Sequence, residues 1–375
     1  MTYKLLVVTT VPITIRGFLL PLIDHFKSLG WRVDGMAQGI TNDLECVESC
    51  DRVWDIQWSR NVLDPRNLLS GVARVQEIVA QGDYDLVHVH TPIAAFVTRY
   101  ALRNLTKPKV VYTAHGFHFY RGNSPIKNAI FFNLEKLAGK WTDYLVTINH
   151  EDANAAKKHN FLPPEKIYYT RGIGVDIDRY AANQSEDEVM RVRQELNLSS
   201  DDTLLLSIAE FTPRKRHRDL LNAAAKLNNS QVHLALAGEG ALQKDMKQLA
   251  HDLGISKQVH FLGFRTDIPT LIQAASAVLL VSQQEGLPRS VMEAMCLDTP
   301  VIGSNIRGTR DLLEDGCGLL VEVGDTDAIA RAIAQIINNP ENSAIMAQKA
   351  KNKMTDYDIK QIIAEYTNIF NLALN

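Results

Sequence analysis

The sequence predicts an α/β fold built from two doubly wound parallel sheets. Short apolar runs alternate with amphipathic stretches along the whole chain, which is the pattern of such sheets. The chain has 375 residues, more than one hydrophobic core usually supports, so two domains are expected. Hydrophobic residues make up 46% of the chain, which is enough to fill two cores.

Each half of the chain contains six candidate strands. All are short apolar runs, as expected for strands that are buried on both faces of a sheet. In the first half they lie at 4–10, 32–38, 53–57, 86–90, 109–115 and 144–149. In the second half they lie at 203–209, 232–238, 259–263, 277–282, 300–304 and 318–321.

A glycine-punctuated segment, residues 168–180, is expected to join the two halves. After a polar break near 356–358, residues 359–374 form a helix-like segment that is apolar on one face and could cross back to the first half. We therefore expect domains at 1–170 and 171–355, followed by a returning helix within 356–375. A cleft between the two domains is where a ligand would bind.

The bulk composition argues against several classes of protein. The formal charge of −3 and the pI near 6.4 disfavour a nucleic-acid-binding protein, which normally carries a basic surplus. Four cysteines in a chain of this size suggest reduced thiols and a cytosolic protein. The opening apolar run, residues 1–12, is too short for a signal peptide or a membrane span, and no later run is long enough. Any contact with the cytoplasmic membrane face would be peripheral.

Two glutamates flank a Gly/Pro turn that opens a short predicted helix. Glu285 and Glu293 lie in the stretch 282–295. If 285–293 were all helical, the two carboxylates would lie about 12 Å apart along the axis. This distance is far beyond the roughly 5 Å that separates the carboxyl groups of a retaining glycosidase. It also fits poorly with the roughly 6.5 to 9.5 Å of an inverting glycosidase. The spacing suits a long ligand better, such as a nucleotide-sugar held at both ends.

The backbone between the two glutamates could bind a diphosphate. The N–H groups of 287–291 lie at a helix start, where unpaired donors and the helix dipole attract phosphate. One carboxylate is then left for sugar hydroxyls and the other for ribose hydroxyls, because carboxylates accept and hydroxyls donate. The simpler alternative is an ordinary strand-turn-helix with solvated acids. The donor-binding candidates in this segment are Glu285, Gly286, Leu287, Pro288, Arg289, Ser290 and Glu293.

Ligands of parallel α/β sheets bind beyond the carboxyl ends of the strands, so the residues that follow each strand are candidates. After 203–209 comes a basic cluster in which Lys215 could neutralise a leaving diphosphate with the help of Arg214 or Arg216, although a solvated basic face is equally compatible. The weaker candidates after the next strands are the Gly-x-Gly turn and a loop whose backbone could contact a nucleobase. They are Gly238 and Gly240, and Phe264 and Arg265.

Four histidines lie at the ends of two strands of the first half or just after them: His88, His90, His115 and His118. They raise the possibility of zinc, but no carboxylate or cysteine completes an obvious ligand set. A neutral imidazole that positions a sugar or acceptor hydroxyl is the better interpretation of His115, and His88 fits a core histidine. The first βα loop lacks a Gly-x-Gly-x-x-Gly motif, so a nicotinamide or flavin site is poorly supported. Arg16 and Gly17 in that loop remain plausible acceptor or phosphate contacts.

These motifs together resemble the GT-B glycosyltransferases of family 4, over nearly the whole chain. The resemblance is closest to the retaining enzymes of bacterial capsule and exopolysaccharide synthesis, through residues 112–120 and 285–295. It implies sugar transfer from a nucleotide donor, with UDP expected, with retained configuration, no obligatory metal and no further cofactor. The first domain would bind the acceptor and the second the nucleotide-sugar.

The resemblance also implies roles for individual residues. Glu285 would contact donor-sugar hydroxyls, Glu293 the ribose, and Lys215 with the backbone of 287–290 the diphosphate. His115 matches the family histidine beside the reacting carbon, so the catalytic candidates are His115, Glu285 and Lys215. Arg16, Gly17, His90 and His118 are the acceptor-side candidates.

One departure concerns the basic cluster, since many members have arginine where this chain has Glu210. Arg214, Arg216 or Arg171 could supply the missing positive charge.

The acceptor is less defined by the sequence. The resemblance suggests a sugar linked to polyprenyl diphosphate or a saccharide, and residues 124–141 form an amphipathic segment with lysines and aromatics. This segment fits a lipid interface and an ordinary domain helix equally well. Two other functions stay open. One is a nucleotide-sugar epimerase or hydrolase of the same fold, and the other is a non-catalytic nucleotide-sugar-binding subunit of an assembly complex.

Overall fold

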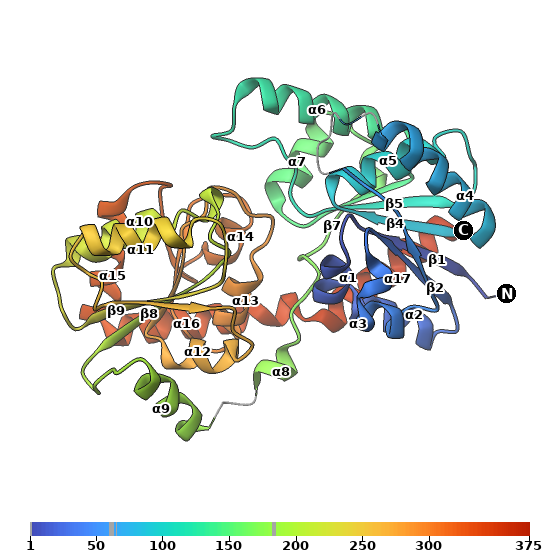
Figure 1. Cartoon of the computed structure of the whole chain (residues 1–375). Helices are drawn as coiled ribbons and strands as arrows, with labels where there is room; N and C mark the ends of the chain where they lie inside the picture. The colour runs from blue at the N-terminus through green and yellow to red at the C-terminus, as the bar shows by residue number, and fades with distance from the viewer. Residues whose placement is uncertain (1, 60–63, 65, 182–184) are drawn as a thin grey trace. The chain divides into compact units, whose positions relative to one another are not determined.

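The computed structural model describes residues 2–59, 64, 66–181 and 185–375, and it divides into two compact units (Figure 1). Unit 1 comprises Met1–Gly174 and Ile359–Asn375, and unit 2 comprises Val175–Asp358. The chain therefore leaves unit 1, forms unit 2 and returns to complete unit 1.

Unit 1 is a seven-stranded parallel sheet with helices on both faces. Its strands are β1 Lys4–Val8, β2 Arg32–Ala37, β3 Arg52–Asp55, β4 Leu86–His90, β5 Lys109–Ala114, β6 Tyr144–Thr147 and β7 Ile167–Tyr169. Its α-helices are α1 Pro12–Phe18, α2 Leu20–Ser28, α3 Leu44–Ser49, α4 Val72–Gly82, α5 Pro92–Leu102, α6 Pro125–Gly139, α7 His150–Lys158 and α17 Ile359–Leu374. Three shorter helical turns are η1 Ile40–Asn42, η2 Asn67–Gly71 and η3 Pro164–Lys166.

Unit 2 is a six-stranded parallel sheet of the same design. Its strands are β8 Thr203–Ile208, β9 Val232–Ala237, β10 Val259–Gly263, β11 Ala277–Leu280, β12 Val301–Ser304 and β13 Leu319–Val321. Its α-helices are α8 Ile177–Ala181, α9 Glu186–Glu195, α10 His217–Leu227, α11 Gln243–Asp252, α12 Ile268–Ala274, α13 Arg289–Cys296, α14 Thr309–Leu313, α15 Thr326–Asn338 and α16 Pro340–Lys353. The short turns are η4 Pro213–Lys215 and η5 Met354–Tyr357.

Both sheets reverse their strand order at one internal position. The order is β3-β2-β1-β4-β5-β6-β7 in unit 1 and β10-β9-β8-β11-β12-β13 in unit 2. The reversal therefore falls between β1 and β4 in unit 1 and between β8 and β11 in unit 2. In doubly wound folds, ligands bind beyond the carboxyl ends of the two strands at such a switch point.

The continuous apolar runs of the sequence form strands that are buried on both faces. In β8, Leu204 and Leu206 pack into one core and Leu205 into the core on the other side of the sheet. The predicted two doubly wound sheets are confirmed. The sequence missed β7, because a three-residue edge strand next to a glycine-rich segment is indistinguishable from a linker by pattern alone.

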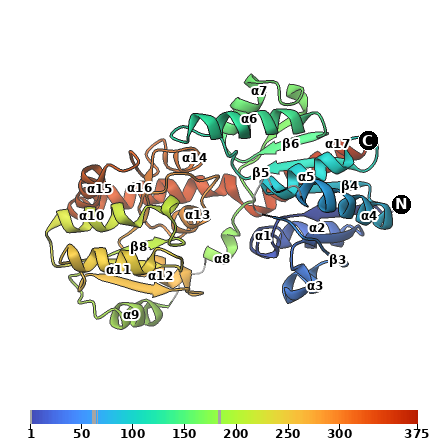
Figure 2. The same cartoon turned by 45° about the horizontal axis from the view of Figure 1, so that its top comes forward.

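The last helix, α17, packs into unit 1, as the sequence predicted (Figures 1 and 2). Its apolar face contributes Ile362, Tyr366, Ile369 and Phe370 to the core that also contains β1 side chains. Phe370 stacks on Phe26 of α2 with ring centroids 4.9 Å apart. Helix α17 thus covers one face of the unit 1 sheet.

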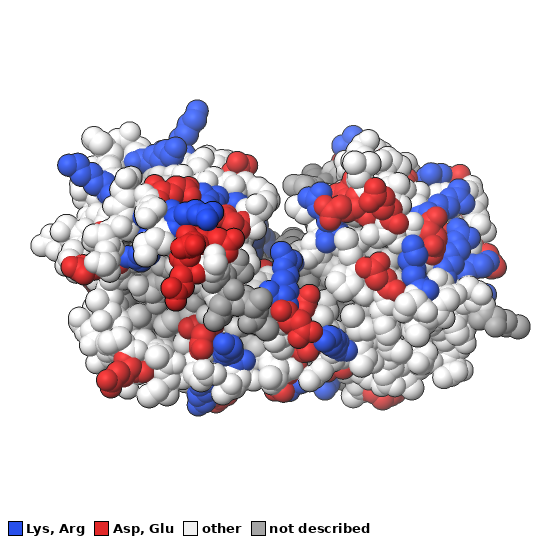
Figure 3. All heavy atoms as spheres, turned by 90° about the horizontal axis from the view of Figure 1, so that it is seen from below, with Lys and Arg blue, Asp and Glu red and all other residues white. Residues whose placement is uncertain are grey.

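Acidic and basic side chains intermingle on the face drawn in Figure 3. This agrees with the nearly balanced charge of the sequence. All four cysteines are buried and unbridged. In the described part of the chain, no helix combines the length and the apolar composition that crossing a membrane requires.

Candidate functional site

The switch point of unit 2 brings Lys215 and Glu285 together. Lys215 ends the short turn after β8, and Glu285 lies in the loop after β11. The Lys215 Nζ atom is 2.6 Å from Glu285 Oε1, and the two side chains are 13% and 8% exposed. The predicted convergence of the basic cluster and the first glutamate is therefore present in the fold.

Neighbouring groups fix the position of Glu285. Arg214 Nη1 lies 3.5 Å from Glu285 Oε2 and donates a hydrogen bond of 3.0 Å to the carbonyl of Gln284. The buried Arg307 donates from Nε to the carbonyl of Glu285 at 3.4 Å. Arg307 lies in the loop after β12.

A close backbone contact also orders the loop that carries Glu285. Gly308 has φ of +73°, and a Cβ at this position would lie 1.9 Å from the carbonyl oxygen of Gly286. A side chain at residue 308 would therefore displace the Glu285 loop. The loops after β11 and β12 act as one packed support.

Glu293, on α13, is also paired. Tyr180 donates from its hydroxyl to Glu293 Oε1 at 2.8 Å, and Arg289 Nε lies 2.9 Å from the same oxygen. Burial and the nearby Glu293 carboxylate raise the pKa of Tyr180 to about 12, so the phenol stays a donor. The side chains of Glu285 and Glu293 are 8% and 12% exposed, so the alternative of two solvated acids is wrong.

The start of α13 presents backbone donors beside Glu285. The first helical bond runs from Met292 N–H to the carbonyl of Pro288, and the N–H groups of the first turn of α13 precede it. Such amides attract anions. Pro288 has no N–H, so the expected run of amide donors from 287 to 290 is interrupted at that residue.

Gly238 and Gly240 lie in the loop after β9, close to the backbone that precedes Lys215. Their φ angles are +147° and +154°, and a Cβ on Gly238 would lie 2.1 Å from the carbonyl oxygen of Ala209. A Cβ on Gly240 would lie 2.6 Å from that of Phe211. The sequence suggested that these glycines allow a ligand to approach. The structure shows that they allow the loop after β9 to pack on the loop that leads to Lys215.

Other basic side chains near this edge are engaged elsewhere. Arg216 pairs with Asp219. Arg265 bonds Glu195 at 2.6 Å and Asp267 at 2.7 Å, while Phe264 is 74% exposed. Of the cations that could replace the arginine missing at Glu210, Arg214 is the one that the structure places beside Glu285.

His217, at the start of α10 and two residues after Lys215, is a buried neutral imidazole. Its ring stacks on Phe211 with centroids 4.2 Å apart. Burial and the Lys215 ammonium lower the pKa of His217 to about 4. The Nε2 atom of His217 is buried and has no hydrogen-bond partner. The sequence gave no signal for this residue beyond its place next to the basic cluster.

At the switch point of unit 1, two threonines meet. Thr10 N donates to Thr91 Oγ1 at 2.9 Å, and the two hydroxyl oxygens are 2.7 Å apart. Thr91 has φ of +61°, which is strained for a β-branched residue. Sequence reasoning missed both residues, because threonine after a strand is common.

Two histidines of β4 and one that follows β5 form a connected group. His90 Nδ1 is 2.8 Å from His115 Nε2, and His90 Nε2 is 3.2 Å from His88 Nδ1. His88 and His90 are fully buried, whereas His115 is partly exposed. His90 was expected to contact the acceptor, but both of its ring nitrogens are bonded inside unit 1. The exposed end of the group is His115.

The other acceptor-side candidates lie at the same edge of unit 1. Arg16, in α1, pairs with Asp43 at 3.1 Å. Gly17, in the same helix, has open space where a Cβ would be. His118 lies in the loop after β5, and its ring packs against Phe131 of α6 with centroids 5.3 Å apart.

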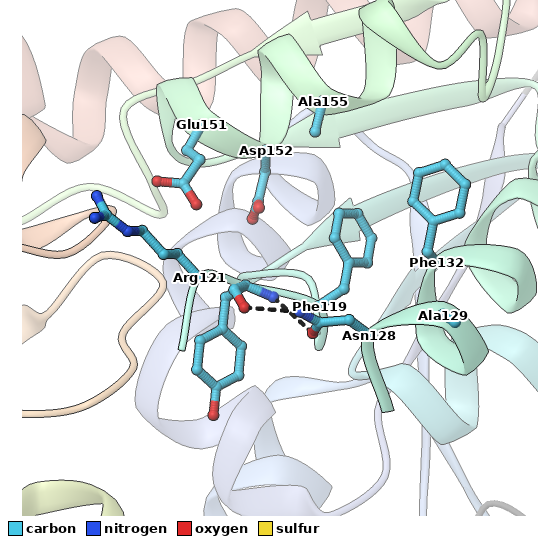
Figure 4. Close-up of a pocket in the computed structure, with 9 residues that line it drawn as sticks. Phe119, Arg121, Asn128, Ala129, Phe132, Glu151, Asp152 and Ala155 are labelled. Carbon is cyan, nitrogen blue, oxygen red and sulfur yellow. Dashed lines mark hydrogen bonds between the residues drawn. The ribbon is translucent and has the colours of Figure 1, made fainter. Parts of the chain in front are cut away.

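A pocket of about 390 Å³ lies within unit 1 (Figure 4). Figure 4 shows the rings of Phe119 and Phe132 on one side of it and the carboxylates of Glu151 and Asp152 facing them from α7. The remaining lining residues are Tyr120, Arg121, Asn128, Ala129 and Ala155. The pocket combines an apolar surface with acceptors of hydrogen bonds, the two features that a sugar ring contacts.

Over the described ranges, no cluster of three or more His, Cys, Asp or Glu side chains is arranged to hold a metal ion.

Comparisons with known proteins agree with this geometry. The model of the glycosyltransferase family 4 matches residues 18–179, and that of the glycosyl transferases group 1 matches residues 189–353. EpsD of Bacillus subtilis, named as a glycosyltransferase, is 34% identical and aligns with 100% of this chain and 98% of its own length. The chain belongs to the family 4 glycosyltransferases. A more distant relative of this glycosyltransferase is the Escherichia coli UDP-Gal:α-D-GlcNAc-diphosphoundecaprenol α-1,3-galactosyltransferase, with 26% identity over 79% of the chain and 76% of the relative.

Solved structures share the fold of this glycosyltransferase. HepE of Anabaena, in complex with UDP and glucose, superposes with a TM-score of 0.83 at 22% identity over 98% of this chain and 99% of its own. Sucrose-phosphate synthase of Thermosynechococcus elongatus gives a TM-score of 0.83 at 20% identity over 99% and 98%. The expected GT-B fold is confirmed.

Proposed function

We propose that this glycosyltransferase transfers a hexose or N-acetylhexosamine from a UDP-sugar to a lipid-linked or saccharide acceptor in the synthesis of a surface polysaccharide. The transfer would retain the anomeric configuration and need no metal. The observation that carries this proposal is the Lys215–Glu285 pair beside the α13 amides. The names of the relatives support the choice of UDP and of a diphosphoundecaprenol-linked acceptor.

Donor binding would rearrange the ion pair. A diphosphate next to Lys215 competes with Glu285 for the ammonium, so the carboxylate becomes available to sugar hydroxyls. Arg214 and the amides of Arg289, Ser290 and Val291 add further positive potential. Tyr180 and Arg289 would hold Glu293 in place for the ribose hydroxyls.

The reaction would be a front-face displacement. The acceptor oxygen bonds to the anomeric carbon on the face from which the diphosphate leaves, and a leaving phosphate oxygen takes the acceptor proton. Negative charge grows on the diphosphate as the bond breaks. Lys215 and the helix amides act most strongly on that growing charge, which is how a preorganised site lowers a barrier.

The unit 1 pocket is our candidate for an acceptor sugar. Phe119 and Phe132 offer an apolar surface for a sugar ring, and the carboxylate of Glu151 would accept from its hydroxyls. The loop after β5 that contributes Phe119 also carries His115 and His118. One loop would thus contact the acceptor at several points.

Helix α6 offers a surface for the lipid part of the acceptor. Ile126, Ile130 and Leu137 are 74%, 46% and 42% exposed and recur at the spacing of one helix face. Exposed lysines flank them at 127, 136 and 140. The acidic residue of the helix, Glu135, instead faces inward to Arg99 and Tyr112, at 3.0 Å each. An apolar stripe bordered by lysines fits an anionic membrane surface.

The decisive experiment is a transfer assay with UDP-hexoses and polyprenyl-diphosphate-linked monosaccharides, preceded by a thermal-shift screen of nucleotide-sugars. We expect a UDP-sugar to raise the melting temperature and product to form only when acceptor is present. The anomeric configuration of the product, measured by NMR, tests retention. An unchanged rate in chelator tests metal independence. Release of free sugar that does not depend on acceptor would instead identify a hydrolase.

A further inference from the structure

The loop after β5 is fastened to the first turn of α6 by hydrogen bonds. Asn128 Oδ1 accepts from Tyr120 N at 3.1 Å, and Asn128 Nδ2 donates to the carbonyl of Tyr120 at 2.9 Å (Figure 4). Asn123 Nδ2 donates to the same Asn128 oxygen at 3.1 Å and to the carbonyl of His118 at 3.1 Å. Both backbone groups of Tyr120 are therefore bonded, and the next residue, Arg121, extends from a fixed point of the loop.

Arg121 is a cation without a protein partner in the unit 1 pocket. Its side chain lines the pocket and is exposed, and in the described part of the chain it makes no hydrogen bond and no ion pair. Several other arginines of unit 1 have a carboxylate oxygen within 3.1 Å, namely Arg16, Arg32, Arg66, Arg74 and Arg99. The N–H donors of Arg121 are therefore available to a ligand.

The guanidinium and a carboxylate lie on the same side of this pocket. Figure 4 shows Arg121 and Glu151 on one side and the rings of Phe119 and Phe132 on the other. A guanidinium donates to phosphate oxygens in pairs, and a carboxylate accepts from hydroxyls. The pocket therefore matches a sugar whose ring lies on the aromatic side chains, whose hydroxyls reach Glu151, and whose neighbouring group is a phosphate or diphosphate.

The exposed apolar stripe of α6 begins next to this cation. Because the loop is fastened to α6, Arg121 lies beside the first turn of the helix, and that turn contains Ile126, the first residue of the stripe. Ala129 is exposed, lines the pocket, and lies between the directions of Ile126 and Phe132 on the helix. The acidic residue in the sequence of α6, Glu135, faces inward, so no negative charge of the helix interrupts this surface.

We propose that Arg121 binds the diphosphate of a lipid-linked acceptor, with the acceptor sugar in the unit 1 pocket and the hydrocarbon along the α6 stripe. The pocket, the guanidinium and the apolar stripe follow one another as the sugar, the diphosphate and the hydrocarbon do in such a molecule. A neutral saccharide would leave the guanidinium without a charged partner. This role rests on the proposed function and selects, of the two acceptors named there, the lipid-linked one.

The test is the affinity of the full chain for two soluble acceptor probes, measured by calorimetry without vesicles, so that phospholipid head groups play no part. One probe is geranyl diphosphoryl-N-acetylglucosamine, and the other is the neutral geranyl N-acetylglucosaminide. The parent protein should bind the diphosphate probe about 10- to 100-fold more tightly, the worth of hydrogen bonds to a charged group. Arg121→Gln should remove this preference and leave the affinity for the neutral probe unchanged. Arg121→Lys keeps the charge without the planar fork, so it should retain part of the preference.

A matched control uses another exposed arginine of unit 1. Arg103 follows α5 and does not line the pocket, so Arg103→Gln should keep the preference for the diphosphate probe. In transfer assays, Arg121→Gln should raise the KM for the diphosphate-linked acceptor about 10- to 100-fold, with kcat and the donor KM little changed.

The role of Arg121 is overturned if the parent protein does not bind the diphosphate probe more tightly than the neutral one, or if Arg121→Gln keeps that preference. These binding measurements need neither donor nor turnover. Transfer to a diphosphate-linked acceptor that does not depend on Arg121 would leave the proposed function standing and remove only this role. An Arg121-dependent preference without any transfer would keep the role and reject the proposed reaction.

Discussion

The ammonium of Lys215 and the carboxylate of Glu285 lie 2.6 Å apart although 70 positions separate them in the sequence. Each residue follows one of the two strands at which the unit 2 sheet reverses its order. The pair is largely buried, so each charge depends on the other in the ligand-free protein. A donor diphosphate would take over the role of Glu285 toward the lysine.

Lys215→Ala should lower kcat by about 100-fold or more, because it would remove the charge that we propose acts on the leaving diphosphate. The free energy of unfolding should fall by only about 1–2 kcal/mol, since Arg214 remains 3.5 Å from the carboxylate. Adding Glu285→Ala should recover stability without recovering activity. Lys226→Ala is the control. Lys226 is exposed near the C-terminal end of α10 and pairs with Asp327. Near-normal transfer by Lys215→Ala would remove the assigned role.

Tyr180→Phe should weaken donor binding. It deletes the 2.8 Å bond to Glu293 but leaves Arg289 in place. The KM for the nucleotide-sugar should rise about fivefold with kcat nearly unchanged, as expected for one lost bond that acts equally on ground state and transition state. Tyr100→Phe, in unit 1, serves as the control. A drop in kcat at constant KM would show that Glu293 acts on the reaction itself.

Gly238→Ala should destabilise unit 2 by about 3 kcal/mol or more, because the new Cβ meets the carbonyl oxygen of Ala209 at 2.1 Å. Gly254→Ala is the matched comparison. Its φ of +73° is also positive, but the added Cβ meets open space, so about 1 kcal/mol is expected. Urea unfolding measures both. Equal losses for the two variants would contradict the packing role of Gly238.

Stability should decline as the pH falls below about 6.5, the ordinary pKa of histidine. Burial lowers the pKa of His88 to about 3 and those of His115 and His217 to about 4. In this window the unfolded chain binds protons that the folded chain excludes, so stability is complete above the window and lost toward its acid end. Urea midpoints at several pH values provide the measurement.

Carboxylates also titrate in acid, so variants are needed to isolate the histidines. His217→Gln removes one buried neutral ring and should flatten the pH dependence. His251→Gln changes a ring that is 79% exposed and should leave the pH dependence of stability unchanged. If His217→Gln kept the slope of the parent protein, the buried ring of His217 would not contribute to the pH dependence.

The α6 surface predicts flotation with anionic vesicles at low salt. Replacing Ile126 and Ile130 together by glutamine should abolish most of the binding, because the apolar stripe would be lost. Salt should weaken binding by screening the flanking lysines. Leu105→Gln changes a 52% exposed leucine outside the helix and should have no effect. Absence of flotation by the parent protein would argue for a saccharide acceptor that is not bound to a membrane.

The sequence was sufficient for the sheets and for one edge of the site. Strand 86–90 was predicted with both ends correct, because its apolar run is bounded by polar turns. Lys215 and Glu285 could be predicted to meet because residues that follow parallel strands share an edge. The first inference uses the pattern of consecutive residues, and the second adds only the rule that parallel strands end at the same edge of a sheet.

Partners from distant segments could not be predicted. Tyr180 reaches Glu293 from the segment that joins the two halves, and Arg307 supports Glu285 from another loop. His88 packs against Tyr366 and Phe370 of α17, which is remote in the sequence. Similarly, the Gly-x-Gly turn at Gly238 was a weak candidate from the sequence, but whether ligand or backbone fills the space beside Gly238 is decided by packing. A single sequence without an alignment does not encode these pairings in a readable pattern.

The return of α17 to unit 1 orders events during synthesis. A ribosome must complete the whole of Val175–Asp358 before it makes the helix that closes the core around Phe26 and supplies Tyr366. Unit 2 can therefore fold while unit 1 still exposes the apolar face that α17 later covers. The nascent chain would need protection there, by a chaperone or by transient collapse, until translation of the last helix ends that vulnerable interval.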